Sequence, residues 1–174
     1  LNRNDRIGRY AWEILSNTLS YAAALVPEVN ESLVAIDDAM KLGYNWIEGP
    51  FEMLDRIGAD VFIARMQGEE RVVPGFLLAA GGRTFYRVRQ GKLQYLLANG
   101  NYANLVRGTG IRRFSEERRC LDPLFENRAA SYFALQGEIG LLEFHSKANT
   151  LDSDSMQLLA AAVDHASAHF KGLI

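Results

Sequence analysis

Cysteine is almost absent from this sequence of 174 residues, in which Cys120 is the single one. One cysteine excludes an internal disulfide, and with it the small secreted domains whose folds depend on disulfides. No stretch comes near the ~18 consecutive apolar residues that a membrane-spanning helix needs, and the polar first ten residues lack the pattern of a signal peptide. We therefore expect a protein of the reducing cytoplasm with no membrane span.

An excess of one charge sign is also lacking, since 19 basic side chains nearly balance 21 acidic ones. The charges are nevertheless uneven. Residues 1–66 carry 6 basic and 10 acidic groups, residues 67–128 carry 11 and 6, and residues 129–174 carry 2 and 5. The basic middle segment favours a phosphate-bearing ligand, docking to acidic neighbouring domains, or a solvated connector. Its basic residues do not follow one helix face, so we expect no nucleic acid partner.

Apolar residues make up 48% of the chain, enough for a buried core, and the length suits one domain or two small ones. In residues 1–66 they recur at three- and four-residue steps, which predicts a long first helix with one apolar face. Asn4 or Asp5 caps its start and Pro27 ends it. The predicted face comprises Ile7, Ala11, Ile14, Leu15, Thr18, Ala22 and Leu25.

Shorter helices are predicted to follow in the same segment. One begins after Asn30 and ends at Gly43, where a positive φ angle is often needed. The next begins at Pro50, because proline suits the first turn of a helix. Residues 60–66 add one or two turns, so we expect a helical domain over residues 1–66.

The basic segment predicts mixed structure. Residues 72–80 suit a short helix that ends at two glycines. Residues 84–88 and 93–97 suit two strands, and Gly91 between them favours a hairpin turn. Residues 99–110, rich in Asn and Gly, are expected to form a loop.

The last segment predicts a hairpin, a helix and the start of a further strand. Residues 131–135 and 139–144 suit the two strands of the hairpin. Asp152 or Ser153 caps the helix. Its predicted apolar positions are Met156, Leu159, Ala160, Val163, Ala166 and Phe170. Because the chain begins with Leu1 and ends on an apolar strand start, we expect a piece of a longer protein.

Residues with reactive side chains form no clear constellation. His165 and His169 are spaced for a two-histidine metal site but lack a third ligand, so we expect a solvated helix face and no metal. His145 follows a strand with no nucleophile identified beside it. Cys120 lies next to arginines, which lower thiol pKa values, but ordinary packing is the better interpretation.

Two further clusters admit a functional and a structural interpretation. Residues 108–113 combine glycines with arginines that suit phosphate, but they match no phosphate-loop pattern, so a turn with exposed arginines is favoured. An acidic cluster occurs between residues 37 and 55. Most of its carboxylates are expected on the surface or at helix N-termini, which favour negative charge. Its members are Asp37, Asp38, Glu48, Glu52 and Asp55.

The sequence of residues 36–43, IDDAMKLG, and of residues 49–58, GPFEMLDRIG, resembles the C-terminal domain of 3-hydroxyacyl-CoA dehydrogenases. The resemblance covers about residues 5–66 and implies an all-helical domain of the 6-phosphogluconate-dehydrogenase C-terminal type. In this family the domain packs against a dinucleotide-binding domain, helps to enclose the acyl chain and often forms subunit contacts. The resemblance therefore also allows that the protein forms a homodimer.

The resemblance also implies where the chemistry lies. The NAD site and the catalytic His–Glu pair of the family belong to the other domain, so we expect no catalytic residue and no cofactor in this chain. Asn4 does not match the family's asparagine near the substrate, because Gly8 and Arg9 follow where the motif differs. The chain looks like the second copy of this domain in multifunctional β-oxidation proteins.

Residues 139–152, IGLLEFHSKANTLD, resemble the start of a crotonase, the enoyl-CoA hydratase fold. The resemblance covers about residues 129–174 and implies CoA contacts at Lys147, Ala148 and Asn149. The oxyanion-hole amides and catalytic carboxylates of a crotonase lie downstream, so hydratase activity is not expected. The predicted fold class is mainly α: a helical domain, then a small α+β part with short hairpins and a truncated crotonase start.

Together the two resemblances imply a non-catalytic portion of a fused 3-hydroxyacyl-CoA dehydrogenase and enoyl-CoA hydratase of fatty acid β-oxidation. The parent protein would oxidise 3-hydroxyacyl-CoA with NAD, and its missing nucleotide-binding and crotonase domains would be partners of this chain. The alternative is a domain-docking or dimerisation module without ligand chemistry of its own.

Overall fold

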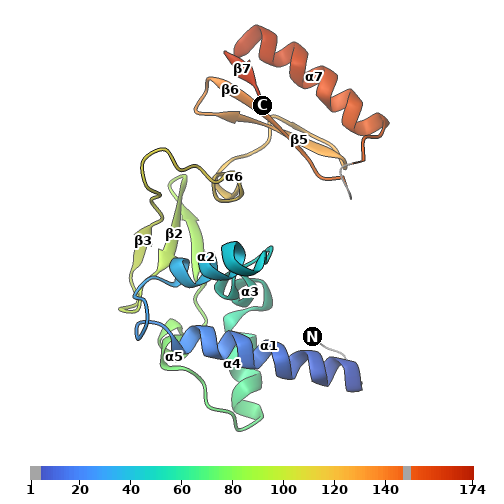
Figure 1. The fold of residues 1–174 in the computed structure, drawn as a ribbon. Coiled ribbons are helices and arrows are strands. Elements are labelled where there is room, and N and C mark those ends of the chain that lie inside the picture. The colour runs from blue at the N-terminus through green and yellow to red at the C-terminus, as the bar shows by residue number, and fades with distance from the viewer. Residues whose placement is uncertain (1–4, 147–149) are drawn as a thin grey trace. The chain divides into compact units, whose positions relative to one another are not determined.

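The computed structural model describes residues 5–146 and 150–174 and divides the chain into two compact units. Unit 1 extends to Arg112, and unit 2 runs from Arg113 to Ile174. Helices dominate the first unit and a small sheet with one long helix forms the second (Figure 1). The prediction of a helical domain followed by a small α+β part is confirmed.

Unit 1 contains five helices and a small antiparallel sheet in the described part of the chain. The strand order β1-β2-β3 places the hairpin strands side by side, with Gln90 and Gly91 in the turn at positive φ. The elements are α1 (Arg6–Ala24), α2 (Leu33–Tyr44), α3 (Pro50–Ile57), α4 (Ala59–Gly68), α5 (Gly75–Ala80), β1 (Tyr86–Arg89), β2 (Lys92–Leu96) and β3 (Tyr102–Asn104).

The ends of these elements follow local chemistry. The carboxylate of Asp5 caps α1 by accepting a hydrogen bond from the backbone N–H of Gly8 at 2.7 Å, as predicted. Pro50 begins α3 as its first residue, also as predicted. The prediction for the end of α2 is wrong by two residues, because Asn45, and not Gly43, adopts the left-handed conformation there. The predicted loop at 99–110 contains β3.

The predicted apolar face of α1 is not the face that the helix buries, because Ala22 alone of its seven members is buried. The buried residues of α1 are mostly small and lie around Trp12, whose ring centroid is 5.4 Å from that of Phe62 in α4. Ile7, Ile14 and Ala11 are exposed instead. Apolar spacing alone did not reveal that the small side chains allow α1 to approach its neighbours closely. The residues that α1 buries are Gly8, Trp12, Ser16, Leu19, Ala22 and Ala23.

The core of unit 1 centres on an aromatic cluster that joins α3, α5 and the start of the sheet. Phe51, Phe76 and Phe85 lie with ring centroids 5.1–5.8 Å apart in tilted or edge-to-face pairs, an arrangement that aromatic quadrupoles favour. Phe51 and Phe85 are fully buried. The cluster therefore fixes α3 against the strand that follows α5.

Unit 2 is a four-stranded sheet, in the order β4-β5-β6-β7, with one long helix packed against it. β5 and β6 form the predicted hairpin, and β6 and β7 pair in parallel. Parallel neighbours need a crossover connection, which α7 supplies. The elements are α6 (Phe114–Glu117), a 3₁₀ turn (Arg118–Cys120), β4 (Phe125–Glu126), β5 (Ala130–Leu135), β6 (Ile139–Phe144), α7 (Ser153–His169) and β7 (Gly172–Leu173).

Helix α7 begins as predicted, but of its predicted apolar positions Ala166 alone is buried. Asp152 accepts a hydrogen bond from the backbone N–H of Ser155 and so caps the helix. Met156 and Val163 are exposed, whereas α7 buries Ser155, Leu158, Ala162 and Ala166.

The predicted boundaries at residues 66 and 128 do not coincide with the boundary between the units, which falls after Arg112. Asp55 of α3 accepts hydrogen bonds from the backbone N–H groups of Phe85 and Tyr86. The first half of the basic segment is thereby attached to the helices, so net charge was a poor guide to where one compact unit ends.

Candidate functional site

The acidic cluster predicted between residues 37 and 55 forms the junction of α2, α3 and β1. Asp37 lies at its centre and is fully buried. One oxygen of its carboxyl accepts a hydrogen bond from the backbone N–H of Phe51 at 2.8 Å. The other accepts from the hydroxyl of Tyr86, also at 2.8 Å. The expectation of a surface charge is therefore wrong for Asp37, which joins three elements through one side chain.

Gly49 is required beside this carboxyl. A Cβ atom built on Gly49 would overlap the side-chain atoms of Asp37. Gly49 thus lets the loop before α3 pass directly over the carboxyl, so that the first turn of α3 can present the N–H of Phe51 to it. The GP pair of the sequence motif therefore has a steric explanation in this junction.

The two carboxylates of α3, Glu52 and Asp55, also hold elements together. Glu52 accepts a hydrogen bond from the backbone N–H of Gly49 at 2.9 Å and forms an ion pair with Lys41 of α2, with both oxygens at 3.1 Å. Asp55 accepts from the backbone N–H groups of Phe85 at 2.6 Å and Tyr86 at 2.8 Å. These bonds attach α3 to α2 on one side and to β1 on the other.

Burial changes the acidity of two side chains at this junction. Desolvation raises the pKa of Asp37 to about 7, although the hydrogen bonds from Phe51 and Tyr86 act in the opposite direction. Desolvation and the neighbouring Asp37 raise the pKa of the Tyr86 hydroxyl. A perturbed carboxyl often marks an active site. Asp37 has no exposed surface, however, so no substrate can reach it in this conformation.

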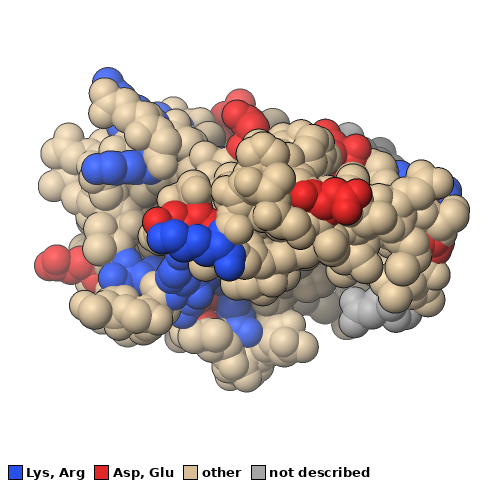
Figure 2. Space-filling model, turned by 90° about the horizontal axis from the view of Figure 1, so that it is seen from above, with Lys and Arg blue, Asp and Glu red and all other residues tan. Residues whose placement is uncertain are grey.

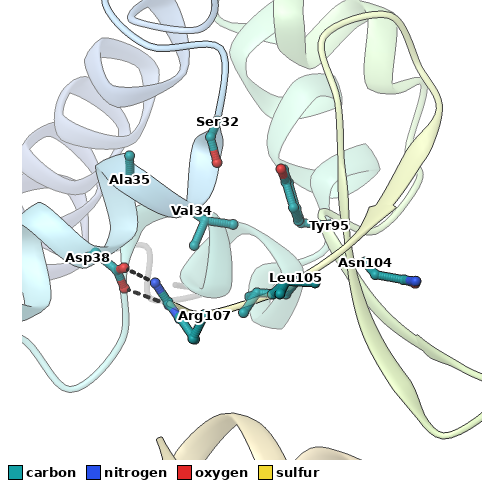
Figure 3. A pocket seen from close by; sticks show the side chains of 9 residues that line it. Ser32, Val34, Ala35, Asp38, Tyr95, Asn104, Leu105 and Arg107 are labelled. Atoms are coloured by element: carbon teal, nitrogen blue, oxygen red, sulfur yellow. Dashed lines mark hydrogen bonds and ion pairs between the residues drawn. The ribbon is translucent and has the colours of Figure 1, made fainter. Parts of the chain in front are cut away.

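A pocket of about 370 Å³ lies beside this junction, between the start of α2 and the segment after β3 (Figure 3). Its outer wall is an ion pair in which the guanidinium of Arg107 spans both carboxylate oxygens of Asp38. The hydroxyl of Tyr95 points into the space near Ser32. The lining residues are Ser32, Val34, Ala35, Asp38, Tyr95, Asn104, Leu105, Val106 and Arg107.

A second hollow of unit 1, which we call the α1 groove, is larger and more apolar. It measures about 580 Å³ and lies along the predicted apolar face of α1. Ile47 forms part of its wall and is 96% exposed. Arg56 and Glu48 form an ion pair at 2.7 Å on its edge. The lining residues are Tyr10, Ala11, Ile14, Leu15, Thr18, Trp46, Ile47, Glu48, Met53 and Arg56.

The sequence predicted that both histidines of α7 lie on a solvated helix face, but only His169 is exposed. His165 packs edge-on against Phe125 and Tyr132, with ring centroids at 5.2 and 5.7 Å. His169 stacks on His165 at 4.3 Å and is itself exposed. Among residues 5–146 and 150–174, no three His, Cys, Asp or Glu side chains come together as metal ligands.

The end of β6 carries a second polar group in unit 2. Glu143 forms an ion pair with Arg118 at 3.1 Å, and its other carboxylate oxygen lies 3.4 Å from the imidazole Nε2 of His145. Cys120 is half-buried and has a free thiol. The proposed CoA contacts Lys147, Ala148 and Asn149 lie outside the described residues, as does Asn4.

The surface carries both signs of charge. On the face drawn in Figure 2, blue basic side chains gather in one group with red acidic side chains next to it. The basic segment contributes ion pairs such as Arg107 with Asp38. The expectation that nucleic acid is not a partner stays a prediction. Among the described residues, none of the helices is long and apolar enough to cross a bilayer.

The fold and junction define unit 1 as a helical domain whose motif carboxylates hold elements together. In a comparison with known protein families, residues 9–90 match the model described as 3-hydroxyacyl-CoA dehydrogenase, C-terminal domain. The prediction of this domain is confirmed over that range, which extends past residue 66 into the β1–β2 hairpin. A following crotonase domain is a prediction that the comparisons do not test.

Curated relatives agree with this assignment. In an alignment 174 positions long that covers 98% of this chain, it is 33% identical to a "Probable 3-hydroxyacyl-CoA dehydrogenase" of Bacillus subtilis, of which it spans 22%. Over 54 residues, 31% of this chain and 8% of the relative, it is 43% identical to a "Putative fatty acid oxidation complex trifunctional enzyme" of Rickettsia prowazekii. The Rickettsia felis protein of that name is 49% identical over 47 residues, 27% of this chain and 6% of its own length. No solved structure matches.

Sequence reasoning missed two features that the structure shows. Asp37 and Tyr86 are 49 residues apart, and no local pattern announces their hydrogen bond. The α1 groove was missed because apolar residues at helical spacing are ordinarily assigned to a core. The adjacent motif residues Gly49 and Pro50 were the available signal for the first feature, since close backbone approach is a common reason for glycine.

We predict that Gly49→Ala destabilises unit 1. The added methyl group overlaps Asp37, and overpacking of this kind costs about 1–3 kcal/mol of unfolding free energy. Urea denaturation followed by tryptophan fluorescence measures the loss, because both tryptophans, Trp12 and Trp46, lie in unit 1. Gly43→Ala is the matched control. It has open space around it, so its unfolding free energy stays within about 1 kcal/mol of wild type. Equal losses in both variants contradict the steric role.

We predict that Asp55→Ala costs about 2–4 kcal/mol of unfolding free energy. The change leaves the N–H groups of Phe85 and Tyr86 without their acceptor, and each buried unpaired donor costs about 1–3 kcal/mol. Hydrogen exchange at these two amides should accelerate more than elsewhere in the β1–β2 hairpin. Asp60→Ala, at an exposed carboxylate of α4, serves as the control. Unchanged exchange at both amides would show that Asp55 does not hold the strand.

Proposed function

We propose that this chain is a non-catalytic part of a multidomain enzyme of fatty acid β-oxidation that oxidises 3-hydroxyacyl-CoA with NAD. The observation that carries the proposal is the relative of Bacillus subtilis, which is similar over 98% of this chain. Because the chain spans 22% of that relative, the activity belongs to the whole protein and is proposed for it alone.

The geometry of unit 1 supports a scaffold role. Asp37, Glu52 and Asp55 all bind backbone or side-chain groups of neighbouring elements. Carboxylates used in this way set the positions of helices and are not presented to a substrate. NAD would be bound by a different domain of the parent protein, and the cytoplasm is the proposed location.

Unit 2 is proposed to be the beginning of an enoyl-CoA hydratase domain. Its hairpin, helix and parallel strand follow the order that the resemblance implies, and the match to the Bacillus relative includes this unit. The names of the Rickettsia relatives, trifunctional enzymes of a fatty acid oxidation complex, support a parent with several activities. Lys147, Ala148 and Asn149 are proposed to contact CoA.

A second candidate function is a docking or dimerisation module, which the α1 groove favours. The first turns of α1 are exposed on nearly all sides, with Ile7 and Tyr10 exposed by more than 60%. Large contiguous apolar patches on a soluble protein commonly mark an interaction surface. Within the parent protein the groove would bind another domain, and in the isolated chain it would bind a second copy.

We predict that the purified chain does not turn over acetoacetyl-CoA with NADH, measured as absorbance loss at the nicotinamide band. The longer protein that contains this chain should show the activity under the same conditions. Activity that copurifies with the chain through successive columns contradicts the proposal that its chemistry lies elsewhere. An inactive longer protein contradicts the proposed reaction itself.

We predict that the apparent molar mass of the chain, measured by light scattering, increases with concentration because the chain self-associates. Ile47→Ser should weaken this self-association several-fold. Ile47 is almost fully exposed, so its replacement should leave the fold unchanged. Val72→Ser is the control, since Val72 is 89% exposed and lies outside the α1 groove. A strict monomer over a wide concentration range excludes dimerisation through the groove and leaves docking within the parent protein.

A further inference from the structure

Asp37 differs from every other charged side chain of the described residues, because it alone is fully buried. Its two hydrogen-bond donors, the N–H of Phe51 and the hydroxyl of Tyr86, are both neutral. No Lys, Arg or His in the described part of the chain forms an ion pair with it. A buried carboxylate with neutral partners has lost its hydration without gaining an opposite charge.

The charged groups that surround Asp37 do not supply the missing opposite charge. Lys41 of α2 is engaged by both oxygens of Glu52 at 3.1 Å, so this pair is close to neutral. Asp38, the next residue of α2, forms an ion pair with Arg107. The titratable groups facing Asp37 are Asp38 and Lys41 of α2, Glu52 of α3 and Tyr86 of β1.

We propose that the junction of α2, α3 and β1 is a proton-linked clamp, in which Asp37 takes up a proton when unit 1 folds and releases it as the pH rises. The neutral carboxyl can keep the bond from Phe51 on one oxygen. Its own O–H then donates to Tyr86, because a phenol hydroxyl accepts as well as donates. The clamp therefore exists in two protonation states with the same three elements joined.

The effect of pH on stability follows from the direction of the shift. Burial raises the pKa of Asp37 from 3.8 to about 7. Between these values the folded unit binds one more proton than the unfolded chain does, so rising pH favours unfolding. Relative to a variant without the carboxyl, the unfolding equilibrium constant should rise about tenfold per pH unit from about pH 4 to pH 7. It should then level off.

The direction is the reverse of that for a carboxylate held by an ion pair, which stabilises a protein as the pH rises. The stabilisation that burial of the neutral carboxyl allows is thus complete below about pH 4 and is lost as the pH rises to about 7. The change centres on the attachment of β1 and of the first turn of α3. A change in pH between about 4 and 7 would therefore alter how firmly the small sheet is held to the helices.

The test is urea denaturation of the full chain between pH 5 and pH 7, followed by the fluorescence of Trp12 and Trp46. The ratio of the unfolding constants of wild type and Asp37→Asn should rise about a hundredfold over these two pH units. Asp60→Asn makes the same chemical change at an exposed carboxylate of unit 1, and its ratio should stay within about threefold. A constant ratio for Asp37→Asn overturns the proposal.

A second measurement keeps the proposal falsifiable if Asp37→Asn does not fold. In the native wild type, the ¹³C resonance of the Asp37 carboxyl should titrate near neutral pH. In Tyr86→Phe the ionised form loses one donor, so the midpoint should move to higher pH. A carboxyl that titrates below pH 5, or a midpoint that Tyr86→Phe leaves in place, overturns the proposal.

Discussion

One buried carboxyl, that of Asp37, organises the first unit of this protein. The N–H that it accepts belongs to the first turn of α3, and the O–H belongs to β1, so the helices and the small sheet meet at two bonds of 2.8 Å. Gly49 clears the space for it, while Glu52 and Asp55 extend the same scheme to α2 and to the strand. The aromatic core of Phe51, Phe76 and Phe85 packs around elements that this polar junction has positioned.

The sequence could predict those parts of the fold that depend on neighbouring residues. The cap at Asp5, the start of α3 at Pro50 and the β5–β6 hairpin are confirmed, because each is determined within a few residues. The buried face of α1 could not be predicted in this way. Which side of a helix is buried depends on the shape of its neighbours. In α1 the small residues Gly8 and Ser16 face the core, whereas the larger Ile7 and Ile14 do not.

In the candidate site, too, local features could be predicted from the sequence and contacts between distant residues could not. The motif around residues 36–58 identified a domain type, and residues 9–90 match that family. The role of Asp37 was misjudged, because a carboxylate in an amphipathic helix is ordinarily exposed and its partner Tyr86 is 49 residues away in the sequence. The acidic residues of the motif had no visible chemical purpose at sequence level, and their purpose in the structure is attachment.

The small residues on the buried face of α1 have a consequence for how such a domain can diversify. Contact between α1 and the core depends on Gly8, Ser16, Ala22 and Ala23, which tolerate little change in volume. The opposite face, with Ile7, Tyr10 and Ile14, is free of that constraint. Mutations there can remodel the outer surface while the interior stays intact. Substitutions that α1 tolerates should therefore recur along the helix with its own periodicity.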